Sequence, residues 1–261
     1  TGYDKDLLIE PDEKDDIVPE NAPTRAKLGD VWALGPHRVM CGDSTDKDTV
    51  ARLMDGKKAD MVFTDPPYNT GMKPKHDSSR MSHVFNDAFT EEEYQTLLRE
   101  SLNRCFENTK GEAVFYICID WRRIGQIKQV IEELMPVKNV IVWDKIVHGL
   151  GSDYKFTYEL IVVGKKGNPK IENCYGNEYQ DIWRIQRKIG RNESHATAKP
   201  IELCERPIKH ASKEDDIVLD LFLGSGSTLI AAEKTNRICY GMEIDPKYVD
   251  VIIARYEQFT G

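Results

Sequence analysis

The chain is 261 residues long, 40% of its residues are hydrophobic and 31% are charged, and its formal net charge is −8. This length and composition fit a soluble protein with one sizeable domain and exclude a transmembrane helix, because no apolar run approaches the roughly 18 residues that a span needs. The six cysteines form no Cys-x-x-Cys pair and the acidic N-terminus does not resemble a signal peptide, which disfavours a disulfide framework or a zinc site and favours a reduced, cytoplasmic protein with structural thiols.

Residues 1–24 form an acidic segment at the N-terminus. Residues 1–20 contain eight Asp or Glu residues and two lysines, a net charge of −6, so the rest of the chain carries only −2. Prolines within this run and the lack of an apolar period predict a tail or linker. The first residue is Thr1 and not Met, which leaves open an upstream domain to which this segment was joined.

From residue 27 onwards, short apolar runs alternate with amphipathic stretches. The apolar runs predict strands at residues 60–64, 113–119, 140–143, 157–164, 217–222 and 239–243. The amphipathic stretches predict helices at residues 91–108, 121–135, 200–211, 227–235 and from residue 246. Strands that alternate with helices are typical of a mostly parallel sheet with helices on both faces, so the sequence predicts an α/β domain over residues 25–261.

Two long segments interrupt this pattern. Residues 71–90 are polar, contain Gly and Pro, and directly follow the end of a predicted strand. Residues 145–197 contain one strand and then irregular basic and aromatic sequence, and within residues 138–200 eleven Lys or Arg residues outnumber seven Asp or Glu residues. Long loops in compact domains serve as lids or binding loops, or are disordered. A basic region suits a polyanionic partner, although ordinary surface lysines explain the same charge equally well.

A glycine-rich turn follows the strand that ends near Asp220. In Asp220-Leu-Phe-Leu-Gly-Ser-Gly-Ser-Thr228 the turn opens a helix, and a further strand ends at Glu243. Glycines let the backbone approach a ligand, and the free N–H groups of a helix N-terminus suit a carboxylate or a phosphate. An acid at the tip of the next strand is where nucleotide-binding folds hold a ribose diol. The pair favours an adenosine-containing ligand over a purely structural turn, and Leu229 in place of a third glycine disfavours NAD.

The segment Thr64-Asp-Pro-Pro-Tyr-Asn69 points to chemistry on an aromatic amine. Such an amine is a poor nucleophile because its lone pair is delocalised into the ring, and two acceptors directed at its hydrogens localise that pair. Asp65 supplies a carboxylate oxygen, Pro66 supplies a main-chain carbonyl, and the fixed φ angles of the prolines hold both groups. Tyr68 offers a ring on which an extruded base can stack, and the chemistry requires no metal ion. The alternative is a tight turn capped by Asp65.

Together the two motifs resemble those of the amino-group DNA methyltransferases of bacteria and phages. The motif Asp65-Pro-Pro-Tyr68 precedes the loop Phe222-Leu-Gly-Ser-Gly-Ser-Thr228, an order that resembles the circularly permuted beta group. Cys41-Gly-Asp-Ser-Thr45 resembles the family's Gly-Asp segment near the cofactor adenine, and His195-Ala-Thr-Ala-Lys-Pro200 resembles its His-Pro-Thr-x-Lys-Pro element beside the methionine end of the cofactor. Ala196 departs from the family's usual Pro, which puts the tightness of that turn in doubt.

This resemblance covers residues 25–260 and implies a fold, a cofactor and a set of site residues. The implied fold is Rossmann-like, with a seven-stranded mixed sheet, one antiparallel edge strand and helices on both faces. The implied cofactor is S-adenosylmethionine. The residues expected at the cofactor are Asp43, Asp65, Lys199, Asp220, Phe222, Gly224, Ser225, Gly226, Thr228 and Glu243. The expected catalytic residues are Asp65, Pro66, Pro67 and Tyr68.

We therefore expect a DNA methyltransferase that flips an adenine out of double-stranded DNA and methylates its N6, in the cytoplasm of a bacterium or a phage-infected cell. In the family that it resembles, Asp at the head of the catalytic motif favours adenine, and cytosine N4 is the nearest alternative. A DNA-binding module without turnover is disfavoured by the intact motifs. An RNA or protein methyltransferase is disfavoured by their order.

Residues 71–90 are expected to close over the flipped base, and residues 145–197 to carry most of the target recognition. The residues expected to bind DNA are Lys73, Lys75, Arg80, Arg184, Arg187, Lys188 and Arg191. Trp143, Lys145 and Glu159 resemble the strand that flanks the family's base pocket, although a core Trp and a surface Glu explain them nearly as well. Trp183 is expected in the core, and the loop histidines His76 and His83 in solvent. The sequence leaves open a homodimer, an upstream domain and a partner nuclease.

Overall fold

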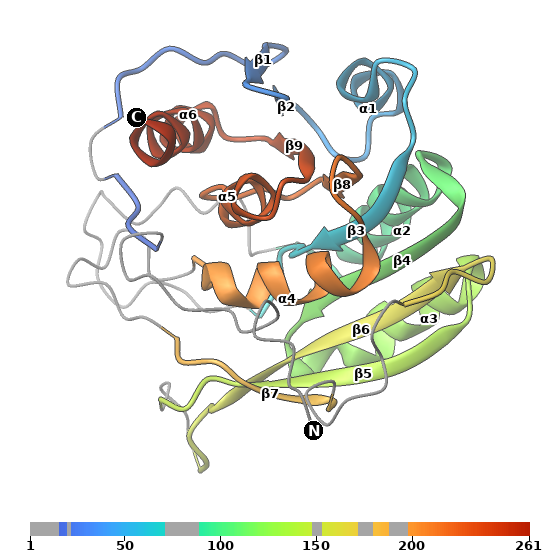
Figure 1. Cartoon of the computed structure of the whole chain (residues 1–261). Helices are drawn as coiled ribbons and strands as arrows, with labels where there is room; N and C mark the ends of the chain where they lie inside the picture. Colours follow the sequence, from blue (N-terminus) through green and yellow to red (C-terminus); the bar gives the residue numbers. More distant parts are fainter. Residues whose placement is uncertain (1–15, 20–21, 71–88, 148–152, 172–179, 188–197) are drawn as a thin grey trace.

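A mixed sheet forms the centre of the computed structural model, which describes residues 16–19, 22–70, 89–147, 153–171, 180–187 and 198–261 (Figure 1). Its strands are β1 (Val31–Leu34), β2 (His37–Cys41), β3 (Ala59–Thr64), β4 (Thr109–Ile119), β5 (Val137–Asp144), β6 (Tyr158–Lys166), β7 (Ile182–Arg184), β8 (Ile217–Asp220) and β9 (Ile238–Glu243). Across the sheet they follow the order β1-β2-β9-β8-β3-β4-β6-β5-β7. Strands that are distant in the chain are therefore neighbours in space.

The direction of the strands decides where their loops meet. Each pair along the run β2-β9-β8-β3-β4 is parallel. β6 is antiparallel to both β4 and β5, so β5 and its parallel partner β7 run in the same direction as β4. β1 is antiparallel to β2. The carboxyl ends of all the described strands except β1 and β6 therefore lie at one edge of the sheet.

The α/β class expected from the sequence is confirmed, but two details of the sheet differ. The described residues contain nine strands instead of seven, and besides the antiparallel edge strand β1 a second antiparallel strand, β6, lies inside the sheet. β1 and β7 have only four and three residues, too few for an alternating pattern to stand out. β6 is buried along its centre because it has a partner on each side. β2 and the helix α1 (Lys47–Met54) were not predicted from the sequence either.

Helices cover both faces of the sheet (Figure 1). On one face lie α1, α2 (Glu91–Glu107) and α3 (Ile124–Leu134), the last preceded by a 3-10 turn at Trp121–Arg123. On the other face lie α4 (Ile201–Ala211), α5 (Ser227–Lys234) and α6 (Pro246–Thr260). α2 begins with a capping box, in which the Thr90 hydroxyl accepts a hydrogen bond from the Glu93 N–H and the Glu93 carboxylate accepts one from the Thr90 N–H.

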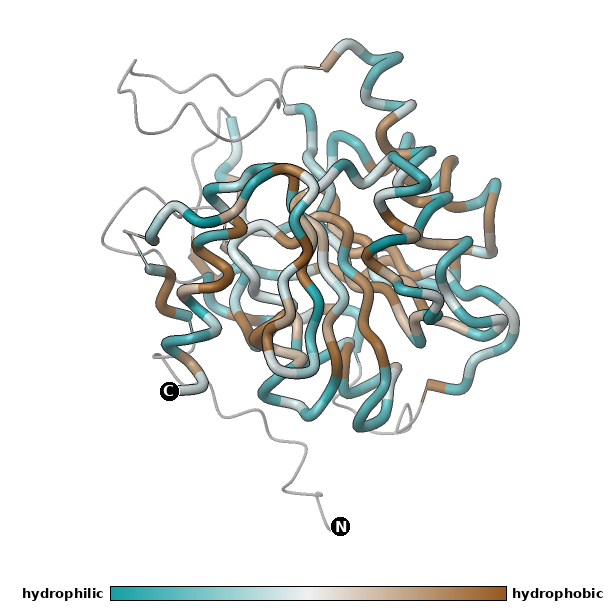
Figure 2. Tube along the Cα trace, turned by 90° about the horizontal axis from the view of Figure 1, so that it is seen from above, coloured by the Kyte–Doolittle hydropathy of each residue, from teal (hydrophilic) through white to brown (hydrophobic). Residues whose placement is uncertain are grey.

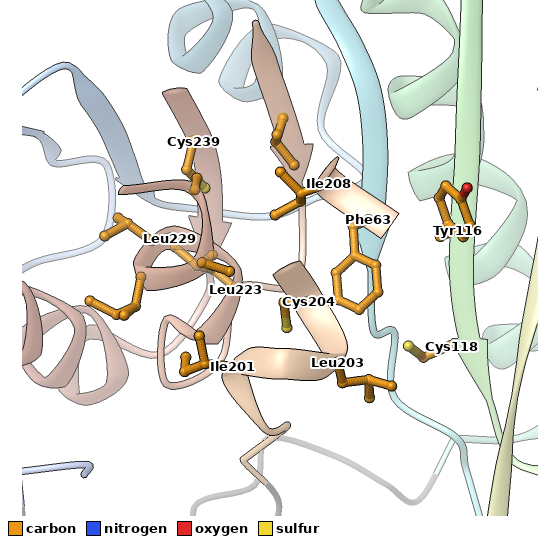
Figure 3. Close-up of a cluster of buried hydrophobic side chains, with 14 of the residues drawn as sticks. Phe63, Tyr116, Cys118, Ile201, Leu203, Cys204, Ile208, Leu223, Leu229 and Cys239 are labelled. Atoms are coloured by element: carbon orange, nitrogen blue, oxygen red, sulfur yellow. The ribbon is translucent and has the colours of Figure 1, made fainter. Parts of the chain in front are cut away.

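Two hydrophobic cores hold these layers together. Val50 and Leu98 belong to the core between the sheet and α1, α2 and α3. Leu203 and Ile252 belong to the core on the opposite face. Figure 3 shows the latter core, where side chains of α4 gather beside Phe63 of β3, and Figure 2 shows hydrophobic residues concentrated in the interior. Burial of one such side chain contributes about 1.5–3 kcal/mol to the free energy of folding. The two cores therefore stabilise the sheet whose edge forms the cleft described below.

Further sequence-based expectations concern the cysteines, one tryptophan and the membrane. The five cysteines in the described ranges are all buried and unbridged, which confirms their structural character, and Cys174 lies outside those ranges. Trp183 is buried, as expected. None of the described helices combines the length and the apolar character that a membrane crossing requires.

Candidate active site

A cleft opens at the edge of the sheet where the carboxyl ends of the strands meet. Its lining comes from the loops that follow β2, β3, β4, β8 and β9 and from the start of β6, and its volume is about 1860 Å³. Open α/β sheets bind ligands at this edge. Pockets for one small ligand typically measure about 300–1,000 Å³, so this cleft has room for more than one ligand.

Asp220 organises the loop that follows β8. Its Oδ1 accepts hydrogen bonds from the Thr64 hydroxyl at 2.7 Å and from the Phe222 N–H at 3.0 Å, and its Oδ2 accepts one from the Thr228 hydroxyl at 2.7 Å. Burial raises the pKa of Asp220 to about 6, although these donors act in the opposite direction. Asp220 thus ties β3, the loop and α5 together at the floor of the cleft. Phe222, Ser225 and Thr228 line the cleft beside it.

Two glycines let this loop turn towards Glu243. Gly224 has a φ of 54° and Gly226 a φ of 86°, both in the left-handed region that side chains disfavour. The turn directs the Gly224 N–H to Glu243 Oε2 at 2.9 Å. Gly226 caps the start of α5, is not among the described residues that line the cleft, and would place a Cβ 3.2 Å from Ile252. Gly226 therefore acts through the backbone, whereas Gly224 faces the cleft.

Glu243 and Asp43 lie at the ends of two neighbouring strands. β9 and β2 are parallel and pair Glu243 with Cys41, which brings Asp43 to the same end of the sheet. Glu243 Oε1 accepts a hydrogen bond from the Asp245 N–H at 2.9 Å, and burial raises the pKa of Glu243 to about 7. Asp43 Oδ1 accepts hydrogen bonds from the N–H and the hydroxyl of Thr45, both at 2.8 Å. Both carboxylates line the cleft, and their expected contact with an adenosine stays a prediction.

The four expected catalytic residues directly follow β3 and line the same cleft. The Tyr68 hydroxyl donates a hydrogen bond to Asp65 Oδ1 at 2.6 Å. Burial raises the pKa of Tyr68 well above its usual value and the carboxylate of Asp65 adds to the effect, so the phenol keeps the proton that it donates. Pro66 is buried and Pro67 half-buried. The fixed φ angles of these prolines hold Asp65 and Tyr68 at the end of β3.

The ammonium group of Lys199 contacts two residues of the catalytic motif. Its Nζ donates a hydrogen bond to Asp65 Oδ2 at 2.5 Å and lies 3.1 Å from the Tyr68 hydroxyl. Burial by itself lowers the pKa of Lys199, but Asp65 and Glu159 raise it and the net direction is upward, so the side chain is charged. Lys199 also lines the cleft, and its expected contact with the cofactor stays a prediction.

The backbone around Lys199 is fixed from two sides. The Ser227 hydroxyl of α5 donates a hydrogen bond to the Lys199 carbonyl at 2.7 Å. Asp16 Oδ1 accepts a hydrogen bond from the Ile201 N–H at 2.8 Å and so caps α4 from outside the helix. Pro200 occupies the N-cap position of α4 and has no side chain that can do this. Sequence reasoning missed both contacts because they join residues far apart in the chain.

Glu159 is the residue whose role the sequence left open. It lies at the start of β6, opposite Trp143 of β5, and its side chain is only 16% exposed. Its Oε1 accepts a hydrogen bond from Lys145 Nζ at 3.2 Å, and its Oε2 lies 3.2 Å from Lys199 Nζ. Burial alone would raise the pKa of Glu159, but the two lysines lower it to about 2. A surface Glu is therefore the wrong interpretation, whereas Trp143 is indeed buried in the core.

Asn69 holds the end of the catalytic motif and was not singled out from the sequence. Its φ is 47°, a left-handed conformation that Asn tolerates better than most residues. Its side-chain amide donates a hydrogen bond to the Phe89 carbonyl and accepts one from the Phe89 N–H, both at 3.0 Å. Its own carbonyl accepts a hydrogen bond from the Arg123 guanidinium at 2.6 Å. One side chain thus joins the two ends of the segment that separates the motif from α2.

Two of the residues expected to bind DNA lie in the described ranges. Arg187 lines the cleft, and Arg184 of β7 has a side chain 67% exposed, 3.7 Å from Asp144. Arg184 is the last residue of β7 and Arg187 lies three residues further on, so both lie at the edge of the sheet that holds the cleft. The residues of the expected site, its loop and its motifs that lie outside the described ranges are Lys73, Lys75, His76, Arg80, His83, Lys188, Arg191, His195 and Ala196.

Comparison with known proteins assigns the chain to a family. The family model described as DNA methylase, of the N6 and N4 type, matches residues 59–255, a range that runs from β3 into α6 and contains both motifs. The DNA adenine methyltransferase YhdJ of Escherichia coli (strain K12) is 26% identical over 245 residues, which cover 80% of this chain and 81% of that relative.

Solved structures share the fold. The complex of M1.HpyAVI with SAM has a TM-score of 0.60 at 21% identity, covering 83% of this chain and 98% of that chain. The cytosine-N4-specific PvuII DNA methyltransferase has a TM-score of 0.63 at 17% identity, covering 85% of this chain and 89% of that chain. At these identities the likeness to solved structures supports only the fold. The match to the family model supports the membership in the family. The chain therefore belongs to the N6 and N4 DNA methylase family and uses S-adenosylmethionine as its cofactor.

Proposed function

We propose that this DNA methyltransferase transfers the methyl group of S-adenosylmethionine to N6 of adenine in double-stranded DNA. The observation that carries the proposal is the position of Asp65. Its carboxylate lies 2.6 Å from the Tyr68 hydroxyl and 2.5 Å from the Lys199 ammonium, in the same cleft as Glu243 and the glycine-rich loop. Adenine is favoured over cytosine because Asp heads the motif and because the relative in E. coli is named a DNA adenine methyltransferase.

The proposed reaction is a direct displacement at the methyl carbon. The adenine amine donates hydrogen bonds to the Asp65 carboxylate and to the main-chain carbonyl of Pro66, which concentrates the lone pair on N6. That lone pair forms a bond to the methyl carbon while the carbon–sulfur bond breaks and its electrons stay on sulfur. The methylated amine, now a strong acid, releases one proton to water. Fixed acceptors that align the amine lower the barrier because they need no reorganisation during the reaction.

The proposal includes extrusion of the target base. An amine inside a duplex is paired through one hydrogen and enclosed by stacked neighbours, so Asp65 and Pro66 cannot reach both of its hydrogens. We propose that residues 71–90 close over the extruded base and that residues 145–197 carry most of the target recognition. Arg187 and the start of β6 belong to the latter segment and line the cleft, which supports its assignment. Residues 1–24 as a tail or linker, a homodimer, an upstream domain and a partner nuclease stay predictions.

Single-molecule sequencing of unmethylated genomic DNA, after incubation with the protein and S-adenosylmethionine, tests the proposed function. We expect N6-methyladenine within a short or relaxed target sequence. N4-methylcytosine would assign the cytosine alternative instead. If no base of the DNA were modified, the alternative of a DNA-binding module without turnover would be favoured.

The charge reversal Arg187→Glu is expected to weaken binding to all DNA sequences to a similar extent. Arg187 lines the cleft three residues beyond the end of β7, and a contact to phosphate carries no sequence information. The slope of log affinity against log salt concentration should become shallower by about 0.9 for each phosphate that Arg187 neutralises in the unaltered chain. Fluorescence anisotropy with two unrelated duplexes measures both effects. The matched control is Lys138→Glu at the opposite end of β5, and an equal slope in both variants would contradict the assignment of Arg187.

The affinity for S-adenosylmethionine is expected to rise between about pH 6 and pH 8, because of Glu243. Ribose hydroxyls donate hydrogen bonds to an ionised carboxylate, whereas burial raises the pKa of Glu243 to about 7 in the free protein. Below that pKa the cofactor must therefore displace a proton, which lowers its affinity. Calorimetry on Glu243→Gln should show binding weaker by about 1.5–3 kcal/mol at high pH and a flatter pH profile. An unchanged pH profile in this variant would mean that Glu243 does not bind the ribose.

A further inference from the structure

Two lysines and two carboxylates form one contact network in the cleft. Lys199 contacts both Asp65 and Glu159, and Lys145 contacts the other oxygen of Glu159. The exposed fractions of the four side chains range from 7% for Lys145 to 26% for Asp65, so water screens these charges little. Buried charges persist only where partners compensate them. The four groups in direct contact carry two positive and two negative charges.

Three oxygen atoms in the described residues lie within 3.2 Å of the Lys199 ammonium. Nζ lies 2.5 Å from Asp65 Oδ2, 3.1 Å from the Tyr68 hydroxyl oxygen and 3.2 Å from Glu159 Oε2. The Tyr68 hydroxyl has one proton, and its distance of 2.6 Å to Asp65 Oδ1, against 3.1 Å to Glu159 Oε2, assigns that proton to Asp65. Glu159 therefore holds the ammonium that, with Tyr68, fixes both oxygens of Asp65.

Charge balance in this network matters because the bound cofactor is a cation. The sulfonium of S-adenosylmethionine is positive, and the positive charge moves to the amine as the methyl group is transferred. Lys199 and Lys145 repel such a charge, and the repulsion is stronger at largely buried side chains than in water. Asp65 cancels one of the two lysines and Glu159 cancels the other. The pKa of about 2 means that Glu159 is ionised at neutral pH despite its burial.

We propose that Glu159 is a positioning residue that fixes Lys199 against Asp65 and, by neutralising the second lysine, keeps the cleft from rejecting the cationic cofactor. The inference rests on the proposed function only in that Asp65 is the acceptor for the amine. On this proposal the negative charge of Glu159 matters, and not only its volume. The product S-adenosylhomocysteine has a neutral thioether in place of the sulfonium, so removal of the negative charge should affect the cofactor and spare the product.

Calorimetric titration of the whole chain with S-adenosylmethionine and with S-adenosylhomocysteine tests this inference. Glu159→Gln retains the shape of the side chain and an oxygen for Lys199 but removes the charge. We expect the ratio of the two dissociation constants, cofactor over product, to rise at least about tenfold. A tenfold change corresponds to two unit charges about 12 Å apart at an effective dielectric constant of about 20, and a shorter separation gives a larger change. Binding of the product also reports that the variant is folded. Glu132→Gln, whose side chain on α3 is 51% exposed, is the matched control and should leave the ratio unchanged.

Two variants of Lys145 separate charge from shape. The double variant Lys145→Met with Glu159→Gln again has equal numbers of positive and negative charges, and its ratio should return to that of the unaltered chain. Lys145→Met alone should lower the ratio of the two dissociation constants. This variant replaces Glu159→Gln as the test if Glu159→Gln does not fold. Equal weakening of both ligands by Glu159→Gln, or a ratio that the double variant does not restore, would overturn the inference. The titrations contain no DNA, so an error in the assignment of adenine would appear only in the sequencing experiment.

Discussion

Replacement of Asp65 by alanine is expected to lower the rate of methyl transfer about 100- to 1,000-fold at saturating cofactor, the usual effect of removing one aligned polar group from a reacting centre. The variant takes away the carboxylate that accepts a hydrogen bond from the amine. It also leaves Lys199 without the partner that it contacts at 2.5 Å. Single-turnover transfer of a radiolabelled methyl group to DNA measures the rate of the chemical step.

Two controls separate this chemical effect from damage to the fold. The affinity of Asp65→Ala for S-adenosylhomocysteine should stay within a few-fold of the unaltered chain, because the product has a neutral thioether in place of the positive sulfonium and Lys199 keeps its contact with Glu159. Asp48→Ala, at an exposed position in the first turn of α1, should keep the full rate of transfer. Near-normal turnover by Asp65→Ala would refute the catalytic assignment.

Duplexes mismatched at the target base are expected to bind more tightly than matched ones, because extrusion costs a few kcal/mol of pairing and stacking that a mismatch has already removed. Tyr68 recovers part of that cost if its half-buried ring stacks on the extruded base, which is worth about 1–3 kcal/mol. Tyr68→Ala should therefore lose affinity for the mismatched duplex by this amount. 2-Aminopurine at the target position should become brighter when the unaltered chain binds.

The matched variant Tyr68→Phe keeps the ring and removes the hydroxyl that donates to Asp65 at 2.6 Å. It should keep most of the affinity for the mismatched duplex and lose part of the transfer rate. Alanine and phenylalanine variants with the same affinity would show that the ring does not stack. Equal binding of matched and mismatched duplexes, together with a dark 2-aminopurine signal, would exclude extrusion into a pocket at Tyr68.

Residues at the ends of parallel strands were the most predictable part of the site. Asp65 follows β3 and Gly224 follows β8, and the two strands are parallel neighbours. Each motif was visible in the sequence because an apolar run ends in a short segment of unusual residues. Parallel strands with crossover helices bring such ends to one edge, so the meeting of the motifs follows from the α/β pattern. The same reasoning applies to Glu243 at the end of β9, whereas Asp43, which follows β2, was singled out only because its segment resembles one in the family.

The contacts of Glu159 were beyond the reach of the sequence for a physical reason. An isolated Glu at the end of a strand is usually solvated, and only partners decide whether it can be buried. Here one partner, Lys145, follows β5, and the other, Lys199, lies two residues before α4. The register that pairs Trp143 with Glu159 brings Lys145 within reach, and no motif encodes that register. A short strand such as β7 was missed for the simpler reason that three residues show no pattern.

The bridge from Asn69 to Phe89 bears on which part of the chain beside the catalytic motif can vary in length. A stretch of chain whose two ends are tied at one point can be exchanged for a longer or shorter one at little cost, since each doubling of loop length adds only about 0.6 kcal/mol of closure entropy. We expect that segments taken from relatives can be grafted between these two residues while the catalytic motif keeps its geometry. Evolution and protein engineering thus share an insertion point beside the reacting centre, where the length of the chain can change while the catalytic motif stays in place.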